Sequence, residues 1–83
     1  MNHFILLPSG DAIANSVIKS VRYINERGVV CTDAQQRVVV WIPVADPVKG
    51  HRVRDILILF AKEPRGIRQP DWSFLNDEVP AVA

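Results

Sequence analysis

The residues of this chain that could do chemistry are one cysteine, two histidines and a few separated aspartates. Cys31 stands in the segment GVVCTD, where no basic residue is adjacent to it. A nucleophilic thiolate needs a nearby base and an oxyanion donor, and the sequence supplies neither at this position. Because free cysteine is among the most often buried residue types, we expect Cys31 to pack in a core.

The histidines do not predict a metal site. Zinc takes three or four protein ligands, and His3 and His51 have no ligand spacing with each other or with Cys31. The glycines are scattered along the chain and form no phosphate-binding loop. We therefore expect no metal ion and no cofactor.

Three aspartates could be imagined as paired carboxylates for acid-base catalysis. Asp33 lies in a polar connector and is explained by a turn, and Asp46 precedes a proline and is explained by helix capping. Asp55 follows Arg54 and is explained by a solvated helix face. With no catalytic constellation left, the sequence predicts a protein that is not an enzyme.

The charges are unevenly distributed along the chain. Residues 1–48 carry no net charge, residues 49–68 carry plus four, and residues 69–83 carry minus three. The candidate basic patch consists of Lys49, Arg52, Arg54, Lys62, Arg65 and Arg68. Such a patch can hold phosphates, which makes nucleic acid an alternative partner. A pI near 8.0 and the lack of a base-reading motif argue for a solvated helix face instead.

The first half of the chain favours short antiparallel strands. Residues 3–7 form a compact apolar run that a cluster of turn formers ends, which predicts a strand. Residues 12–24 fit helical spacing and are also rich in β-branched residues, so helix and strand both remain open there. We favour a strand over residues 17–24, because short polar connectors separate the apolar runs that follow.

Strands are also predicted over residues 29–32 and 37–44, and Gly28 is well placed for a residue with a positive φ. In the second strand Val38, Val40 and Ile42 alternate with Val39 and Trp41. Both faces of this strand are therefore apolar, which is typical of a strand covered on two sides.

The dipeptide Asp46-Pro47 predicts the start of a helix, with Asp46 as N-cap and Pro47 in the first helical position. Apolar residues then recur at helical spacing until Pro64, and we assign a helix to residues 47–62. The rival interpretation is a strand over residues 54–60, because that segment is almost continuously apolar and Gly50 weakens a helix by ~1 kcal/mol.

Residues 64–83 read as an extended C-terminal arm that follows a domain of residues 1–63. The arm holds an aromatic cluster with Trp72, Phe74 and Leu75, which we expect to pack on its own domain or on a partner. Its acidic residues, Asp71, Asp77 and Glu78, lie just beyond the basic segment, which they can approach.

Together these elements predict an α+β fold: an antiparallel meander of three or four strands packed against one helix, followed by the extended arm. One helix covers one face of a sheet, so the second face requires curvature, the arm or another chain. Our leading hypothesis is a non-enzymatic interaction or regulatory module that forms a homodimer, or binds another protein, through the sheet and the arm. The predicted surface comprises Val39, Trp41, Trp72, Phe74 and Leu75.

The sequence also bears on location. The apolar run of residues 4–7 is too short for a signal peptide, and no segment approaches the ~20 apolar residues of a membrane helix. A single cysteine cannot form an internal disulfide. We expect a cytoplasmic protein that does not contact membranes.

Overall fold

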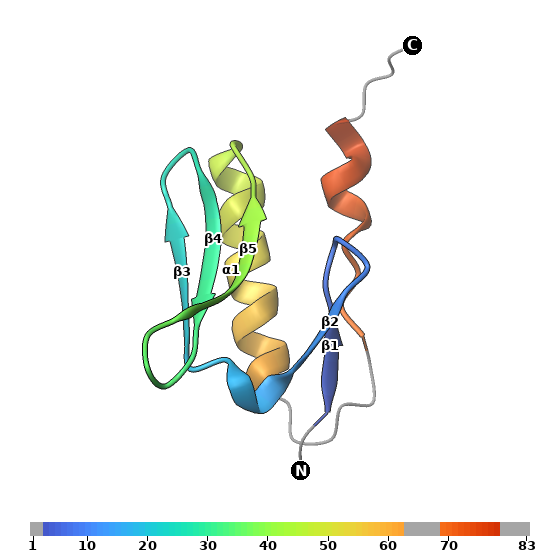
Figure 1. The fold of residues 1–83 in the computed structure, drawn as a ribbon. Helices are drawn as coiled ribbons and strands as arrows, with labels where there is room; N and C mark the ends of the chain where they lie inside the picture. The colour runs from blue at the N-terminus through green and yellow to red at the C-terminus, as the bar shows by residue number, and fades with distance from the viewer. Residues whose placement is uncertain (1–2, 63–68, 79–83) are drawn as a thin grey trace.

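A three-stranded antiparallel sheet, one helix and a small hairpin make up the fold (Figure 1). The computed structural model describes residues 3–62 and 69–78. The sheet has the order β3 (Ser20–Ile24), β4 (Gly28–Thr32), β5 (Val38–Pro43), and α1 (Pro47–Lys62) packs on one of its faces. A hairpin of β1 (Phe4–Leu6) and β2 (Ala12–Ala14) stands beside α1 (Figure 1). The predicted α+β meander on a helix is confirmed.

Residues 12–24, for which the sequence left helix and strand open, are mostly strand. The chain forms β2, one turn of 3-10 helix (η1, Asn15–Val17) and then β3, so the predicted strand begins three residues late. The side chain of Asn15 explains the interruption. Its Oδ1 accepts from the amide of His3 at 2.9 Å, and its Nδ2 donates to the carbonyl of Ala61 at 3.3 Å. These bonds fix the hairpin to the end of α1.

A β-bulge in β5 corrects the predicted alternation of its side chains. Thr32 pairs with Val38 and Cys31 pairs with Val40, which leaves Val39 as an extra residue. Val38 therefore shares a face with Trp41 instead of with Val40 and Ile42. The core-facing row of β5 is thus shorter than the sequence predicts, and an additional apolar side chain lies on the outer face.

Helix α1 begins and ends at the predicted residues, and the rival strand over residues 54–60 is wrong. The Asp46 carboxylate accepts from the amide of Val48 at 2.9 Å, and the Asp46 carbonyl accepts from the amide of Gly50 at 2.8 Å. Asp46 is therefore the N-cap. Gly50 is buried against the ring of Tyr23 in β3, where a Cβ would overlap Cε1 and lie 2.7 Å from Cδ1. Its lack of a side chain lets α1 approach the sheet.

The core lies between α1, the inner face of the sheet and the hairpin. Its fully buried side chains are Ile5, Val29, Cys31, Val53 and Leu57. Within the described ranges, no helix has the length and apolar character needed to cross a membrane.

The described part of the C-terminal arm packs against β1. Gln69 bonds two backbone groups of that strand's outer edge: its Oε1 accepts from the amide of Leu6 at 2.9 Å, and its Nε2 donates to the carbonyl of Phe4 at 3.1 Å. The indole of Trp72 donates to the carbonyl of Leu6 at 2.7 Å. Beyond it, Ser73–Glu78 form a short 3-10 helix, η2, instead of extended chain. The predicted boundary between residues 63 and 64 and the residues from 79 onward lie outside the described residues.

Candidate interaction surface

The cysteine and the histidines that could do chemistry have structural contacts in the fold. Cys31 is fully buried in β4, and burial raises the pKa of its thiol to about 11, so the thiol is protonated near neutral pH. His3 donates through Nε2 to the carbonyl of Phe60 at 3.3 Å, and the His51 ring packs at a tilt against Tyr23 with ring centroids 4.5 Å apart. Across residues 3–62 and 69–78, no three His, Cys, Asp or Glu side chains gather as metal ligands.

The carboxylates of Asp33 and Asp46 likewise bind groups that lie close to them in the sequence. Asp33 Oδ1 accepts from the amides of Gln35 and Arg37, each at 2.9 Å, and Asp33 Oδ2 pairs with the Arg37 guanidinium at 3.0 Å. The backbone hydrogen bond from Arg37 is the largest cause that lowers the pKa of Asp33. Asp33 thus forms the predicted turn, and Asp46 caps α1.

The outer face of the three-stranded sheet carries the largest exposed apolar side chains of β5. Strand pairing aligns Arg22, Val30 and Trp41 in one row across the sheet. Val38 is 63% exposed and Trp41 48% exposed on this face, while α1 covers the opposite one. α1 therefore leaves the Trp41 side of the sheet uncovered.

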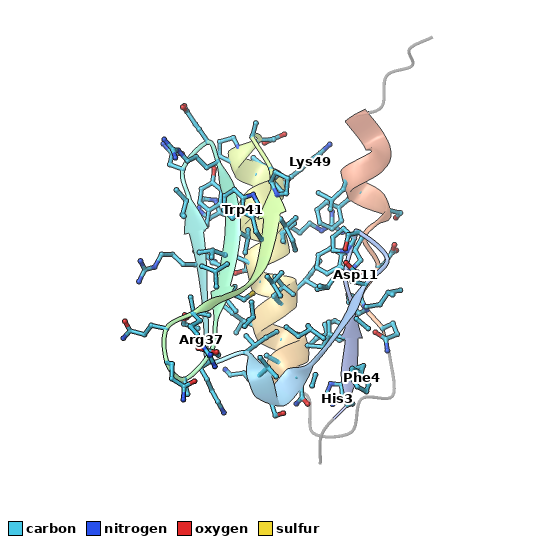
Figure 2. All side chains as sticks on the ribbon, viewed as in Figure 1. His3, Phe4, Asp11, Arg37, Trp41 and Lys49 are labelled. Carbon is cyan, nitrogen blue, oxygen red and sulfur yellow. The ribbon has the colours of Figure 1, made fainter. Side chains whose placement is uncertain are left out.

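A groove of about 800 Å³ runs along the free edge of β5. Every residue from Val39 to Asp46 lines it, although successive side chains of a strand point to opposite faces. A surface that touches all of them must follow the edge of the strand. The opposite wall comes from the turn between β1 and β2, which supplies residues 7–9 and Asp11, and from Leu75. Figure 2 shows Trp41 and Lys49 on one side and Asp11 on the hairpin.

Polar side chains stand at the margins of this groove. Asp11 Oδ2 accepts from the hydroxyl of Ser9 at 3.2 Å, while Asp46 is held by its capping bond to α1. Lys49, in the first turn of α1, also lines the groove. The wall therefore combines an apolar strand edge with two fixed carboxylates and one ammonium group.

The structure divides the interaction residues that the sequence predicted. Val39, Trp41 and Leu75 line the groove together. Trp72 and Phe74 are instead buried in the chain's own core, with ring centroids 6.3 Å apart. Their burial leaves them little surface to offer a partner.

The basic residues do not form one patch within the described part of the chain. The Arg52 guanidinium lies 4.3 Å from the centroid of the Phe74 ring, whereas Arg54 pairs with Asp55 at 3.0 Å. At about 100° per residue, Arg52 and Arg54 project roughly 160° apart around α1. Lys62 is exposed in the last turn of the helix. Arg65 and Arg68 lie outside the described residues.

Sequence reasoning missed several residues of this surface. The outer face includes Arg22, Ile24 and Val30, whose alternation along β3 and β4 was available once the strands were placed. The hairpin wall of the groove was not predictable from local pattern, because residues 7–11 read only as a turn. The bulge that exposes Val38 likewise has no local sequence signal.

Comparison with known proteins adds no relative. No family model matches the chain, and searches of curated proteins and of solved structures find no significant match.

Proposed function

We propose that this protein is a non-enzymatic interaction module that self-associates through the outer face of its three-stranded sheet. The observation that carries the proposal is the exposed apolar surface around Trp41, on the face of the sheet that α1 leaves uncovered. Exposed apolar side chains gathered on an uncovered sheet face are one mark of a binding surface. The buried Trp72 and Phe74 have no part in this version of the interface.

A second copy of the chain suits this face because the face is self-complementary. A two-fold axis parallel to the strands and above Val30 would place β3 of one protomer over β5 of the other. Arg22 of each protomer would then lie over Trp41 of its partner, since both stand in one row with Val30. A guanidinium over an indole is a favourable cation–π pair. The dimer would contain this pair twice.

The size of the face sets the expected affinity. Three strands at ~4.8 Å spacing and five residues at ~3.4 Å rise give about 14 by 17 Å, or roughly 240 Å² in projection. Stable interfaces bury ~800 Å² on each partner, so this dimer belongs to the weak, transient class. We expect a dissociation constant of about 100 µM.

Two valine-to-lysine variants test this interface with matched chemistry. Val38 is 63% exposed on the outer face, and Val48 is 77% exposed on α1. Val38→Lys would bring an ammonium group beside the partner's basic β3, which carries Arg22, and should abolish dimerisation. Val48→Lys adds the same charge away from the interface and should leave the dimer intact.

Sedimentation equilibrium from about 10 µM to about 1 mM measures the outcome. The expected result is a monomer–dimer equilibrium for the parent chain and for Val48→Lys, with Val38→Lys monomeric throughout. A monomeric parent chain over the whole range would refute self-association. Equal dimerisation by both variants would move the interface away from this face.

The distribution of basic side chains does not support the nucleic-acid alternative, because Arg52 and Arg54 project from opposite flanks of α1 and are engaged by Phe74 and Asp55. We further propose a cytoplasmic location, where a single reduced thiol such as Cys31 persists without a disulfide partner.

A further inference from the structure

The backbone of β5 offers hydrogen-bonding groups at its free edge. The amide of Val44 donates to the carbonyl of Arg27 at 3.1 Å. In a strand, the backbone amides and carbonyls of alternate residues point to the same side, so those in step with Val44 point toward β4. The amide and carbonyl of Ile42 point the same way, and those of Trp41 point to the opposite edge. Because β5 pairs only with β4 in the described sheet, that edge faces the groove.

The two ends of this edge limit how far a ladder can extend. Pro43 presents a carbonyl but has no amide hydrogen, and Val39 is the extra residue of the bulge. Regular pairing is therefore centred on Trp41 and short. Both features also fix the register of an added strand. If that strand slipped, one of its carbonyls would lie opposite Pro43, which has no amide hydrogen to donate.

The outer edge of β1 provides a comparison within the same molecule. There the chain uses its own Gln69 and Trp72 to bond the amide of Leu6 and the carbonyls of Phe4 and Leu6. The fold thus covers one strand edge with side chains of the arm. Along β5 the corresponding space is the 800 Å³ groove.

We propose that this groove binds an extended peptide segment of another protein, which adds as a strand beside β5. The peptide backbone would bond to the amide and carbonyl of Trp41, and its alternate apolar side chains would contact Val39 and Leu75. This site uses the edge of β5 and not its outer face, so it does not depend on the proposed dimer.

The surroundings of the groove favour a peptide over the edge of a second copy. In β5-to-β5 pairing, the partner's β4 would lie ~4.8 Å further out in the same direction. The turn of residues 7–11 and Leu75 already form the wall there. A single peptide strand fits beside β5 without needing room for a second strand beyond it.

The charges at the groove favour a basic peptide. The lining includes two acidic residues, Asp11 and Asp46, and one basic residue, Lys49, which gives it a formal charge of minus one. Asp11 is exposed and stands on the hairpin wall, where a cationic side chain of the peptide can approach it. The ligand class is therefore an extended segment with alternating apolar residues and a lysine or arginine at one end.

Synthetic acetylated hexapeptides that alternate valine and threonine test this proposal. Each carries a lysine or a glutamate at its first or last position, and binding to the full chain is followed by amide-resolved NMR up to about 1 mM peptide. We expect at least one lysine peptide to bind, with shifts centred on Trp41 and Leu75 and with affinity about tenfold above its glutamate counterpart. N-methylation of peptide amides that face β5 should abolish binding, and methylation of the intervening amides should preserve it.

Variants of the protein complete the test. Asp11→Lys should reverse the preference toward the glutamate peptides, whereas Asp55→Lys, an equal charge change at an exposed position of α1, should not. Val38→Lys should bind peptide like the parent chain, which separates this site from the dimer face. No binding by any peptide, shifts outside the groove, or indifference to N-methylation would overturn the proposal. In Val38→Lys, which should not form the face-to-face dimer, protection of the Trp41 amide by increasing protein concentration alone would assign the edge to a second copy and overturn it equally.

Discussion

Replacing Gly50 by alanine should destabilise the protein, although alanine is the better helix former. Alanine in place of glycine inside a helix is ordinarily worth ~1 kcal/mol of stabilisation. At Gly50, however, the new Cβ would overlap Tyr23 Cε1 and lie 2.7 Å from Cδ1 and 3.1 Å from Cζ. The ring or the helix must move to relieve these contacts.

The overlap should outweigh the gain in helix propensity. Overpacking of a core by one methyl group typically costs 1–3 kcal/mol, and three ring carbons within about 3.1 Å place this case at the upper end. Movement of the Tyr23 ring is further opposed by its hydroxyl, which accepts from the amide of Glu26 at 3.1 Å. We expect a net loss of about 1–2 kcal/mol.

A double-mutant cycle gives the decisive assay. Urea denaturation should show Gly50→Ala to be less stable than the parent chain, and thermal unfolding should show a fall in Tm of about 4–8 °C for each kcal/mol. In a Tyr23→Ala background the ring is gone, and Gly50→Ala should then stabilise by ~1 kcal/mol. Stabilisation by Gly50→Ala in the parent background would refute the close approach of α1 to β3.

Further predictions concern individual contacts. Asp46→Ala removes the N-cap of α1 and should cost ~1 kcal/mol in urea denaturation, while an unchanged midpoint would contradict the capping role. Trp72→Phe keeps most of the buried ring but removes the indole bond to Leu6, and should lower stability by ~1–3 kcal/mol in the same assay. Cys31 should react with a thiol probe in native protein far more slowly than in denatured protein, because its thiol is buried and has a pKa of about 11; rapid native labelling would contradict this. The lowered pKa of Asp33 means that its contribution relative to Asp33→Asn is present above about pH 4 and is lost as the pH falls through the folded-state value; parallel pH–stability curves for the two proteins would show the turn contacts to be inert.

Elements governed by local chemistry were predictable from the sequence. The limits of α1 follow from Asp46-Pro47 at one end and the apolar spacing before Pro64, and both operate within a few residues. The turn at Asp33 and the positive φ of Gly28, at 153°, are equally local. A contact distant in sequence also requires glycine at this position, because a Cβ there would overlap the carbonyl oxygen of Ile42 in β5 and lie 2.9 Å from the Cα of Pro43.

Features decided by distant contacts were not predictable. β2 is made of Ala12–Ala14, whose composition gives no strand signal, and it forms because β1 pairs with it. The arm packs against β1 because Gln69 matches backbone groups 63 and 65 residues away in sequence. The groove required three such long-range placements at once, namely the hairpin turn, β5 and Leu75.

The candidate site was accordingly predicted in part. Trp41 and Val39 were selected because both faces of their strand are apolar, and both line the groove. The bulge at Val39 determines which valines accompany Trp41 on the outer face, and a bulge is fixed by pairing with β4. The sequence of the aromatic arm did not indicate which face the arm would cover, because the hydrophobic effect is non-directional and favours burial against any apolar surface.

In the proposed dimer, the outer face of the sheet pairs with the same face of a second copy, with Arg22 over Trp41. An isotope-filtered NOE experiment on a mixture of labelled and unlabelled chain, at about 1 mM protein, tests it most directly. The proposed geometry predicts intermolecular contacts between the Arg22 methylene protons of one protomer and the Trp41 indole of its partner. Intermolecular contacts confined to α1, or none at this concentration, would contradict it.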